Sequence, residues 1–133
     1  LSSAVEVDFD KNSSADCLND LTSIAEPKYL HQTTVFHNHC LTFYENLAEV
    51  PFKNPSGLWR VHFHVPIHLQ NIGHLQTTQH CLLEDIAALR NEGVTNWEVE
   101  TYTWSVVPQE IREGVLIDSI SKELAWAASQ IYT

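Results

Sequence analysis

The sequence predicts an α/β fold in which parallel strands alternate with helices. Segments with the two-residue period of strands alternate along the chain with segments that have the period of amphipathic helices. Turn-forming residues separate these segments, most clearly in the loop 53–57 (Lys-Asn-Pro-Ser-Gly). The chain has 133 residues and is 44% hydrophobic, which suffices for one compact core. Alternation of this kind implies parallel strands with helical crossovers, and so few strands cannot close an eight-stranded barrel alone.

The first half of the chain is predicted to begin with a strand and a helix and to continue with a hairpin. Leu18, Leu21 and Ile24 lie on one face of the helical segment, and Pro27 follows its end. Asn38 is a typical turn residue between two segments rich in Thr, Val and aromatic residues. The predicted elements are a strand at 1–7, a helix at 15–25, hairpin strands at 29–36 and 39–44, and a short helix at 45–52.

The second half is predicted to contain two further strands, each followed by a helix. Pro66 ends the first of these strands, Thr77 and Thr78 offer an N-cap for the next helix, and Gly93 is suited to the position after its C-terminus. The predicted elements are a strand at 58–65, a helix from 78 to 92, a strand at 96–104 and a final helix at about 115–131.

Charge and cysteine content limit the classes of partner. The formal net charge is -10, with seven Lys and Arg against seventeen Asp and Glu, which argues against binding to nucleic acid or to an anionic membrane. No stretch approaches the ~20 apolar residues of a membrane span. The three cysteines, Cys17, Cys40 and Cys81, are widely spaced and form no CxxC motif, so reduced thiols and a cytoplasmic location are expected.

Two segments combine ionisable side chains with a strand pattern. His62 and His64 should share one face of the strand 58–65, and Glu98 and Glu100 should share one face of the strand 96–104, because side chains alternate along a strand. Imidazoles and carboxylates at the end of a sheet suit a divalent metal of the Zn, Mn or Fe type. The same groups could transfer protons at a carbon next to a carbonyl. The alternative is that they are hydrogen-bonded polar residues without a function.

Other candidate residues are less specific. His31 could be a further ligand, and the histidines of the loop 68–76 could form a lid, although exposed loop histidines are common. Tyr102 and Trp104 could line a pocket for a flat or cyclic ligand, or could pack against the final helix. The sequence contains no GxGxxG, P-loop, GxSxG or HExxH motif, so nucleotide cofactors and serine hydrolysis have no support.

Several blocks of the sequence resemble the metabolite traffic protein EboE family, whose members are xylose-isomerase-like TIM barrels related to sugar phosphate isomerases and epimerases. The two most specific blocks are WRVHFHVP at 59–66 and WEVETYTW at 97–104. The segments 1–4, 26–32 and 123–126 also fit, so the resemblance runs across nearly the whole chain. It implies that residues 1–133 form a single partial domain, the C-terminal part of a (β/α)8 TIM barrel.

The resemblance also implies a metal site and a partner. Glu100 is similar to the glutamate that closes the metal set on the family's last strand, and His62 and His64 would be the imidazole ligands. Glu98 would support these ligands or act as a base, which makes Glu98 and Glu100 the catalytic candidates. The missing N-terminal half of the barrel would complete the site. The absence of Met and a strand pattern from the first residue fit a chain that begins inside a longer protein, and an open half barrel is expected to self-associate.

Two functions follow from these expectations. The first is a metal-dependent isomerase or epimerase relative that acts on a small hydroxylated or phosphorylated metabolite and is associated with metabolite trafficking. The second is a non-catalytic binding or carrier protein for a small metabolite on the same scaffold. The fold does not decide between them. Turnover with bound metal would indicate the first, and ligand binding without turnover would indicate the second.

Overall fold

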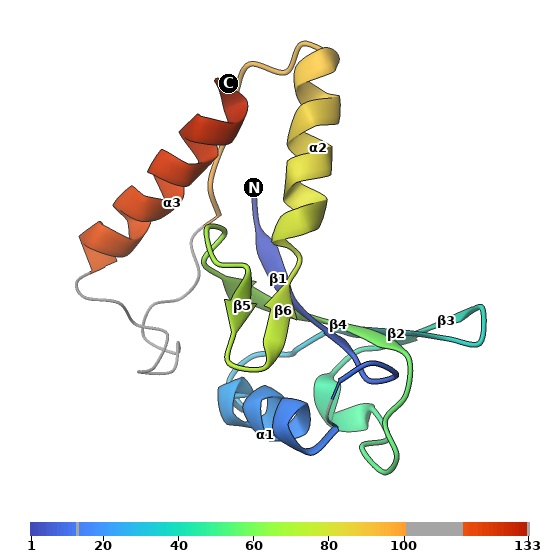
Figure 1. The fold of residues 1–133 in the computed structure, drawn as a ribbon. Helices are drawn as coiled ribbons and strands as arrows, with labels where there is room; N and C mark the ends of the chain where they lie inside the picture. Colours follow the sequence, from blue (N-terminus) through green and yellow to red (C-terminus); the bar gives the residue numbers. More distant parts are fainter. Residues whose placement is uncertain (13, 101–115, 133) are drawn as a thin grey trace.

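A computed structural model describes residues 1–12, 14–100 and 116–132 as a mixed sheet-and-helix domain (Figure 1). The strands are β1 (Ser3–Asp8), β2 (Thr33–His37), β3 (Cys40–Tyr44), β4 (Leu58–Val65), β5 (Asn71–Ile72) and β6 (Leu75–Thr77). The helices are α1 (Ser14–Ile24), the 3₁₀ turn η1 (Leu47–Glu49), α2 (Gln79–Asn91) and α3 (Leu116–Ile131).

The strands form one six-stranded sheet in the order β3-β2-β4-β1-β6-β5, and every pairing within it is antiparallel. The predicted α/β fold with parallel strands, as part of a (β/α)8 barrel, is therefore wrong, and the chain forms a small α+β domain. The reason lies in the position of β4. It pairs with both β1 and β2, so that Val61 faces Val5 on one side and Thr33 on the other. Strands β1 and β2 do run in the same direction, but an antiparallel strand separates them.

Several local predictions are confirmed. The hairpin forms β2 and β3, joined by Asn38 and His39, both of which have positive φ angles of 49° and 62°. This is the backbone of a two-residue type I′ turn. Helix α2 ends at Asn91, and Gly93 follows its C-cap residue, as predicted. Gly93 has a φ of 80°, its N–H donates to Arg90 O at 3.0 Å, and Val94 N–H donates to Leu89 O at 3.1 Å, as in a Schellman motif.

Other predictions are wrong or lie outside the described residues. Residues 96–100 are not in a strand, and residues 101–104, including Tyr102 and Trp104, lie outside the part of the chain that the structure describes. The predicted helix at 45–52 is only the short turn η1, and the predicted loop 68–76 contains β5 and the start of β6.

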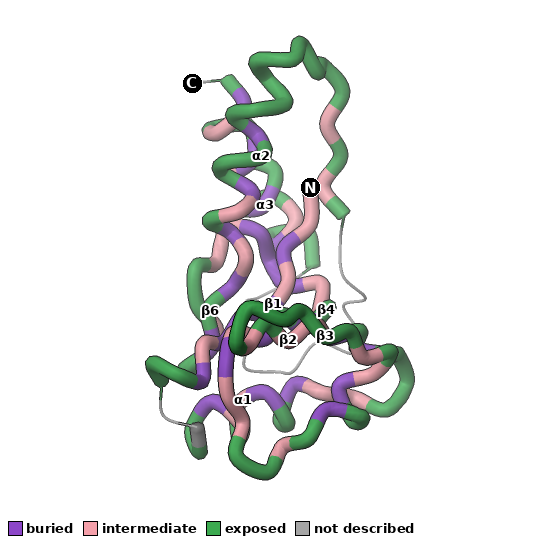
Figure 2. Tube along the Cα trace, turned by 90° about the vertical axis from the view of Figure 1, so that its right-hand side faces the viewer, coloured by how far each residue is buried: buried purple, intermediate pink, exposed green. Residues whose placement is uncertain are grey.

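The buried residues, purple in Figure 2, form two hydrophobic clusters. The larger one, here called the sheet cluster, lies between the sheet and α1 and contains Val5, Val7, Phe9, Cys17, Leu21, Ile24, Leu47, Val50, Trp59, Val61, Val65 and Leu75. The smaller one, here called the helix cluster, lies between α2 and α3 and contains Ile67, Leu82, Ile86, Ala127 and Ile131.

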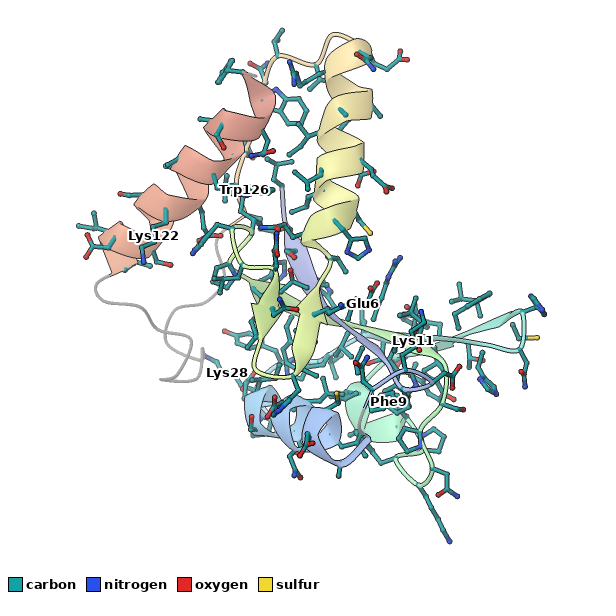
Figure 3. The ribbon with its side chains drawn as sticks, viewed as in Figure 1. Glu6, Phe9, Lys11, Lys28, Lys122 and Trp126 are labelled. Atoms are coloured by element: carbon teal, nitrogen blue, oxygen red, sulfur yellow. The ribbon has the colours of Figure 1, made fainter. Side chains whose placement is uncertain are left out.

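The sheet cluster occupies one face of the sheet because its strand residues alternate. In β1 and β4, Val5, Val7, Trp59 and Val61 are buried against α1. Figure 3 labels Phe9 just after β1, where its ring meets Trp59 edge-on with centroids 4.7 Å apart. The intervening residues lie on the opposite face, here called the outer face. None of the helices among the described residues is long and apolar enough to span a membrane.

Candidate metal-binding site

The outer face carries the two histidines that the sequence singled out. His62 and His64 lie on β4, two residues apart, and their side chains project from the same side of the strand. Their neighbours Val61 and Val65 are buried in the sheet cluster on the other side. The prediction that the two histidines share a face is therefore confirmed, and the two-residue period of the strand explains it.

The two imidazoles point their Nε2 atoms at each other. The Nε2–Nε2 distance is 3.0 Å, and the ring centroids are 4.6 Å apart with an angle of 58° between the planes. With Zn–N bonds of about 2.0–2.1 Å, two ligating nitrogens lie about 2.9 Å apart at a right angle and about 3.3 Å apart at a tetrahedral angle. The observed separation falls between these values, so the distance between the two Nε2 atoms suits the ligation of one metal ion.

Each imidazole is held from its other nitrogen. His62 Nδ1 lies 3.3 Å from Gln32 Oε1, and His64 Nδ1 lies 2.9 Å from Ser2 Oγ. A carbonyl oxygen only accepts, so His62 Nδ1 carries the proton and leaves its Nε2 lone pair unprotonated. His64 Nδ1 also lies 3.8 Å from Glu100 Oε2. A hydrogen-bond acceptor at Nδ1 is the usual arrangement behind a metal-binding histidine.

Glu100 reaches this site without a strand. The N–H of Glu100 donates to Leu1 O at 2.8 Å, and the amino group of Leu1 donates to Glu98 O, so the segment 98–100 runs beside Leu1. The Glu100 side chain is 63% exposed and approaches the Nδ1 side of His64, away from the paired Nε2 atoms. Glu100 therefore lies behind His64, next to the nitrogen that does not face His62. Among the contacts of the described residues, none joins the Glu98 carboxylate to either imidazole.

The remaining histidines lie elsewhere. His31 is buried, stacks on Phe63 with centroids 4.1 Å apart, and its Nε2 lies 3.0 Å from Glu26 O. His74 pairs with Asp20 through Nδ1 at 2.9 Å. His80 lies 3.8 Å from Glu6. None of these contacts brings a further imidazole to the pair on β4.

The surroundings of His62 favour its neutral form. Partial burial lowers the pKa of His62, and the neighbouring rings of His64 and His31 act in the same direction, while Glu100 opposes them. A neutral imidazole is the form that binds a metal, so the shift favours metal binding near pH 7. The same neutral form also permits a direct hydrogen bond between the two Nε2 atoms when His64 carries its proton there.

The site offers two protein ligands and lies on an open surface. Within residues 1–12, 14–100 and 116–132, no three His, Cys, Asp or Glu side chains converge on one point. A cavity of about 480 Å³ lies elsewhere, between α2 and α3, where Leu83, Arg90 and Gln130 contribute to its lining. The site therefore leaves coordination positions that no other residue in the described part of the chain fills.

Two residues of this site were missed in the sequence. Ser2 and Gln32 contact the imidazoles from 62 and 30 residues away along the chain, and no local pattern marks either of them.

In comparisons with protein-family models, curated proteins and solved structures, no match to this chain was found. The resemblance to the EboE family therefore rests on the sequence blocks alone.

Proposed function

We propose that this chain binds a divalent transition-metal ion through His62 and His64. The observation that carries the proposal is the 3.0 Å separation of the two Nε2 atoms, each belonging to a ring supported at Nδ1. Imidazole nitrogen favours Zn²⁺ and its neighbours over Mg²⁺, Ca²⁺ or Mn²⁺, which prefer oxygen ligands. A bound metal would polarise an oxygen-bearing ligand at its open positions.

The geometry supports binding more than turnover. A general base must lie within hydrogen-bond reach of the proton that it removes. Among the contacts in residues 1–12, 14–100 and 116–132, none joins the Glu98 side chain to the pair, and Glu100 is largely exposed and lies behind His64. A role in binding or carrying a small metabolite through a metal-held oxygen therefore agrees best with the site. The isomerase- or epimerase-like activity stands on the resemblance of the two sequence blocks, and turnover of sugar phosphates by the metal-loaded protein tests it.

Titration calorimetry with Zn²⁺ tests the proposal. The wild-type protein should bind about one equivalent, and His62→Ala and His64→Ala should each weaken binding by about tenfold or more, because each removes one of two ligands. Glu100→Gln should weaken binding less, since it alters only the support of His64. His37→Ala on β2 is the matched control and should bind like the wild type.

Two results would contradict the proposal. One is the absence of Zn²⁺ binding in the wild-type protein. The other is equal affinity in the wild type and both alanine variants, which would place the metal at other residues. Affinity should also fall as the pH is lowered, because protons and metal compete for the same nitrogen lone pairs.

A further inference from the structure

The β2–β3 hairpin presents apolar side chains to solvent. Phe36, Leu41 and Phe43 are 47%, 68% and 58% exposed, and all three lie on the outer face. Strand β3 is the last strand at its end of the sheet, and Figure 1 shows the hairpin extending away from the helices. In the described part of the chain, no strand pairs with the outer side of β3.

The turn fixes which backbone groups of β3 are available. In a two-residue hairpin, the residues that flank the turn form a hydrogen-bonded pair, here His37 with Cys40. Hydrogen-bonded and non-hydrogen-bonded pairs then alternate, so Thr42 directs its N–H and C=O toward β2. Leu41 and Phe43, opposite Phe36 and Thr34, direct theirs outward. The free side of β3 therefore presents a regular set of donors and acceptors.

The hairpin also lacks the features that usually protect a sheet edge. Native edge strands are shielded by charged residues, proline, bulges or a covering segment. Residues 29–44 contain no Asp, Glu, Lys, Arg or Pro, although the whole chain carries a net charge of -10. Two copies of this chain repel each other over most of their surface, whereas two hairpins meet without that repulsion.

We propose that a second copy of this chain pairs with β3 in an antiparallel arrangement centred on Thr42, joining the two sheets edge to edge. In this register, Leu41 and Phe43 of one copy form hydrogen-bonded pairs with Phe43 and Leu41 of the other. The outward backbone groups on both strands are then satisfied. Two cross-strand Leu–Phe contacts form on the outer face.

The register follows from the residues at the ends of β3. Centring on Thr42 places all five residues of β3 opposite β3 of the second copy and brings the imidazole of His39 opposite the carboxylate of Glu45, which can accept a hydrogen bond from it. Centring on Phe43 would place Leu41 opposite the charged Glu45, and centring on Leu41 would leave Tyr44 unpaired. The twofold axis of an antiparallel pair is perpendicular to the sheet, so the His62–His64 pairs of both copies lie on the same side of the joined sheet.

Sedimentation velocity of the full chain over a wide concentration range tests the association. The wild-type protein should show a reversible monomer–dimer equilibrium. Phe43→Lys should weaken dimerisation by about tenfold or more, because it removes both Leu–Phe contacts and places two ammonium groups at the interface. Leu124→Lys, at an exposed apolar position on α3, is the matched control and should associate like the wild type.

A cysteine pair tests the register. In a Cys40→Ser, Cys81→Ser background, Thr42→Cys should form a disulfide-linked dimer on mild oxidation, since a non-hydrogen-bonded pair brings the Cα atoms to about 4.5 Å. Leu41→Cys in the same background should not, because the two copies of residue 41 lie on opposite sides of the axis. A monomer at all concentrations, association unaffected by Phe43→Lys, equal loss in Leu124→Lys, or cross-linking through Leu41→Cys instead of Thr42→Cys would each overturn the proposal.

Discussion

The sheet cluster and the helix cluster differ in size. The sheet cluster contains twelve buried apolar residues from β1, α1, β4, β6 and the segments around them. The helix cluster contains five, and the buried carboxyl group of Glu123 lies on the same helix as two of them. The free energy of burial scales with apolar area, so the larger cluster should contribute more to the stability of the fold.

Two buried polar side chains of the helices hold Ile67, a member of the helix cluster, at the end of the sheet. Ile67 follows Pro66 beyond the end of β4, where the strand ladder no longer supplies hydrogen bonds. Glu123 Oε2 accepts from Ile67 N–H at 3.2 Å, and Gln79 Nε2 donates to Ile67 O at 2.9 Å. Helices α3 and α2 thus each satisfy one backbone group of Ile67. The small helix cluster is therefore held by buried polar contacts as well as by apolar packing.

Trp59→Ala is expected to cause the largest loss in the free energy of unfolding. Trp59 is 2% exposed and contacts Phe9 and Phe52 in the sheet cluster. Its truncation should lower the free energy of unfolding by about 3–5 kcal/mol, measured by urea denaturation. Hydrogen exchange should accelerate throughout the domain, because β4 connects both clusters.

Ile86→Ala is the matched change in the helix cluster, at a residue that is also 2% exposed. The loss should be about 2–3 kcal/mol, with the acceleration of exchange concentrated in α2 and α3. Equal acceleration in β1 and β4 would show that the two clusters unfold as one unit.

A pH-dependent effect is expected from Glu123. Its side chain is 1% exposed, its Oε1 has no hydrogen-bond partner among the described residues, and burial raises its pKa above the ordinary value of 4.5. The folded protein therefore holds this proton at pH values at which the unfolded chain has lost it. Because of this shift, the Glu123 carboxyl makes its full contribution to the free energy of unfolding below pH 4.5. This contribution is lost as the pH rises through the folded-state pKa of Glu123.

Glu123→Gln tests this effect because glutamine keeps the shape and the acceptor but cannot ionise. The difference in unfolding free energy between the variant and the wild type should grow in favour of the variant as the pH rises from 4.5. It should level off once Glu123 is ionised in the folded state. Parallel stability curves for the two proteins between acid and neutral pH would contradict the assignment.

Local features of the fold were predictable from the sequence, and the pairing of strands was not. The hairpin around Asn38, the strand 58–65 and the helix ending before Gly93 depend on residues close together in the chain. The direction of each strand relative to its neighbours depends on contacts between distant segments. The insertion of β4 between β1 and β2 has no local signal, and alternation of strands and helices therefore suggested a parallel sheet.

In the candidate site, too, local features were predictable from the sequence and contacts between distant segments were not. The common face of His62 and His64 follows from their spacing in one strand. The supporting contacts from Ser2, Gln32 and Glu100 come from three separate segments. Of these, Glu100 was predicted, but as a ligand on a strand, and its observed position is behind His64. The common strand face predicted for Glu98 and Glu100 is wrong because residues 96–100 are not in a strand.

The smallest effect is expected from Arg90, which links the two helices of the helix cluster at the surface. Arg90 lies in the last turn of α2, and its Nη1 donates to Gln130 O near the end of α3 at 3.1 Å. A cation near two helix C-termini interacts favourably with both helix dipoles and with the carbonyl groups at the helix ends. Arg90→Met keeps the aliphatic stem and removes the guanidinium, so the free energy of unfolding should fall by about 0.5–1 kcal/mol at low salt.

Lys53→Met, at an exposed lysine in the loop before β4, controls for the loss of a positive charge from an acidic chain. The loss of unfolding free energy in Arg90→Met minus the loss in Lys53→Met measures the link between the helices. This difference should shrink as salt is added, because the contact is exposed. A loss as large as that of Ile86→Ala would show that polar bridges, more than apolar packing, hold α3 against α2. The contrast between the two clusters would then be one of interaction type and not only of size.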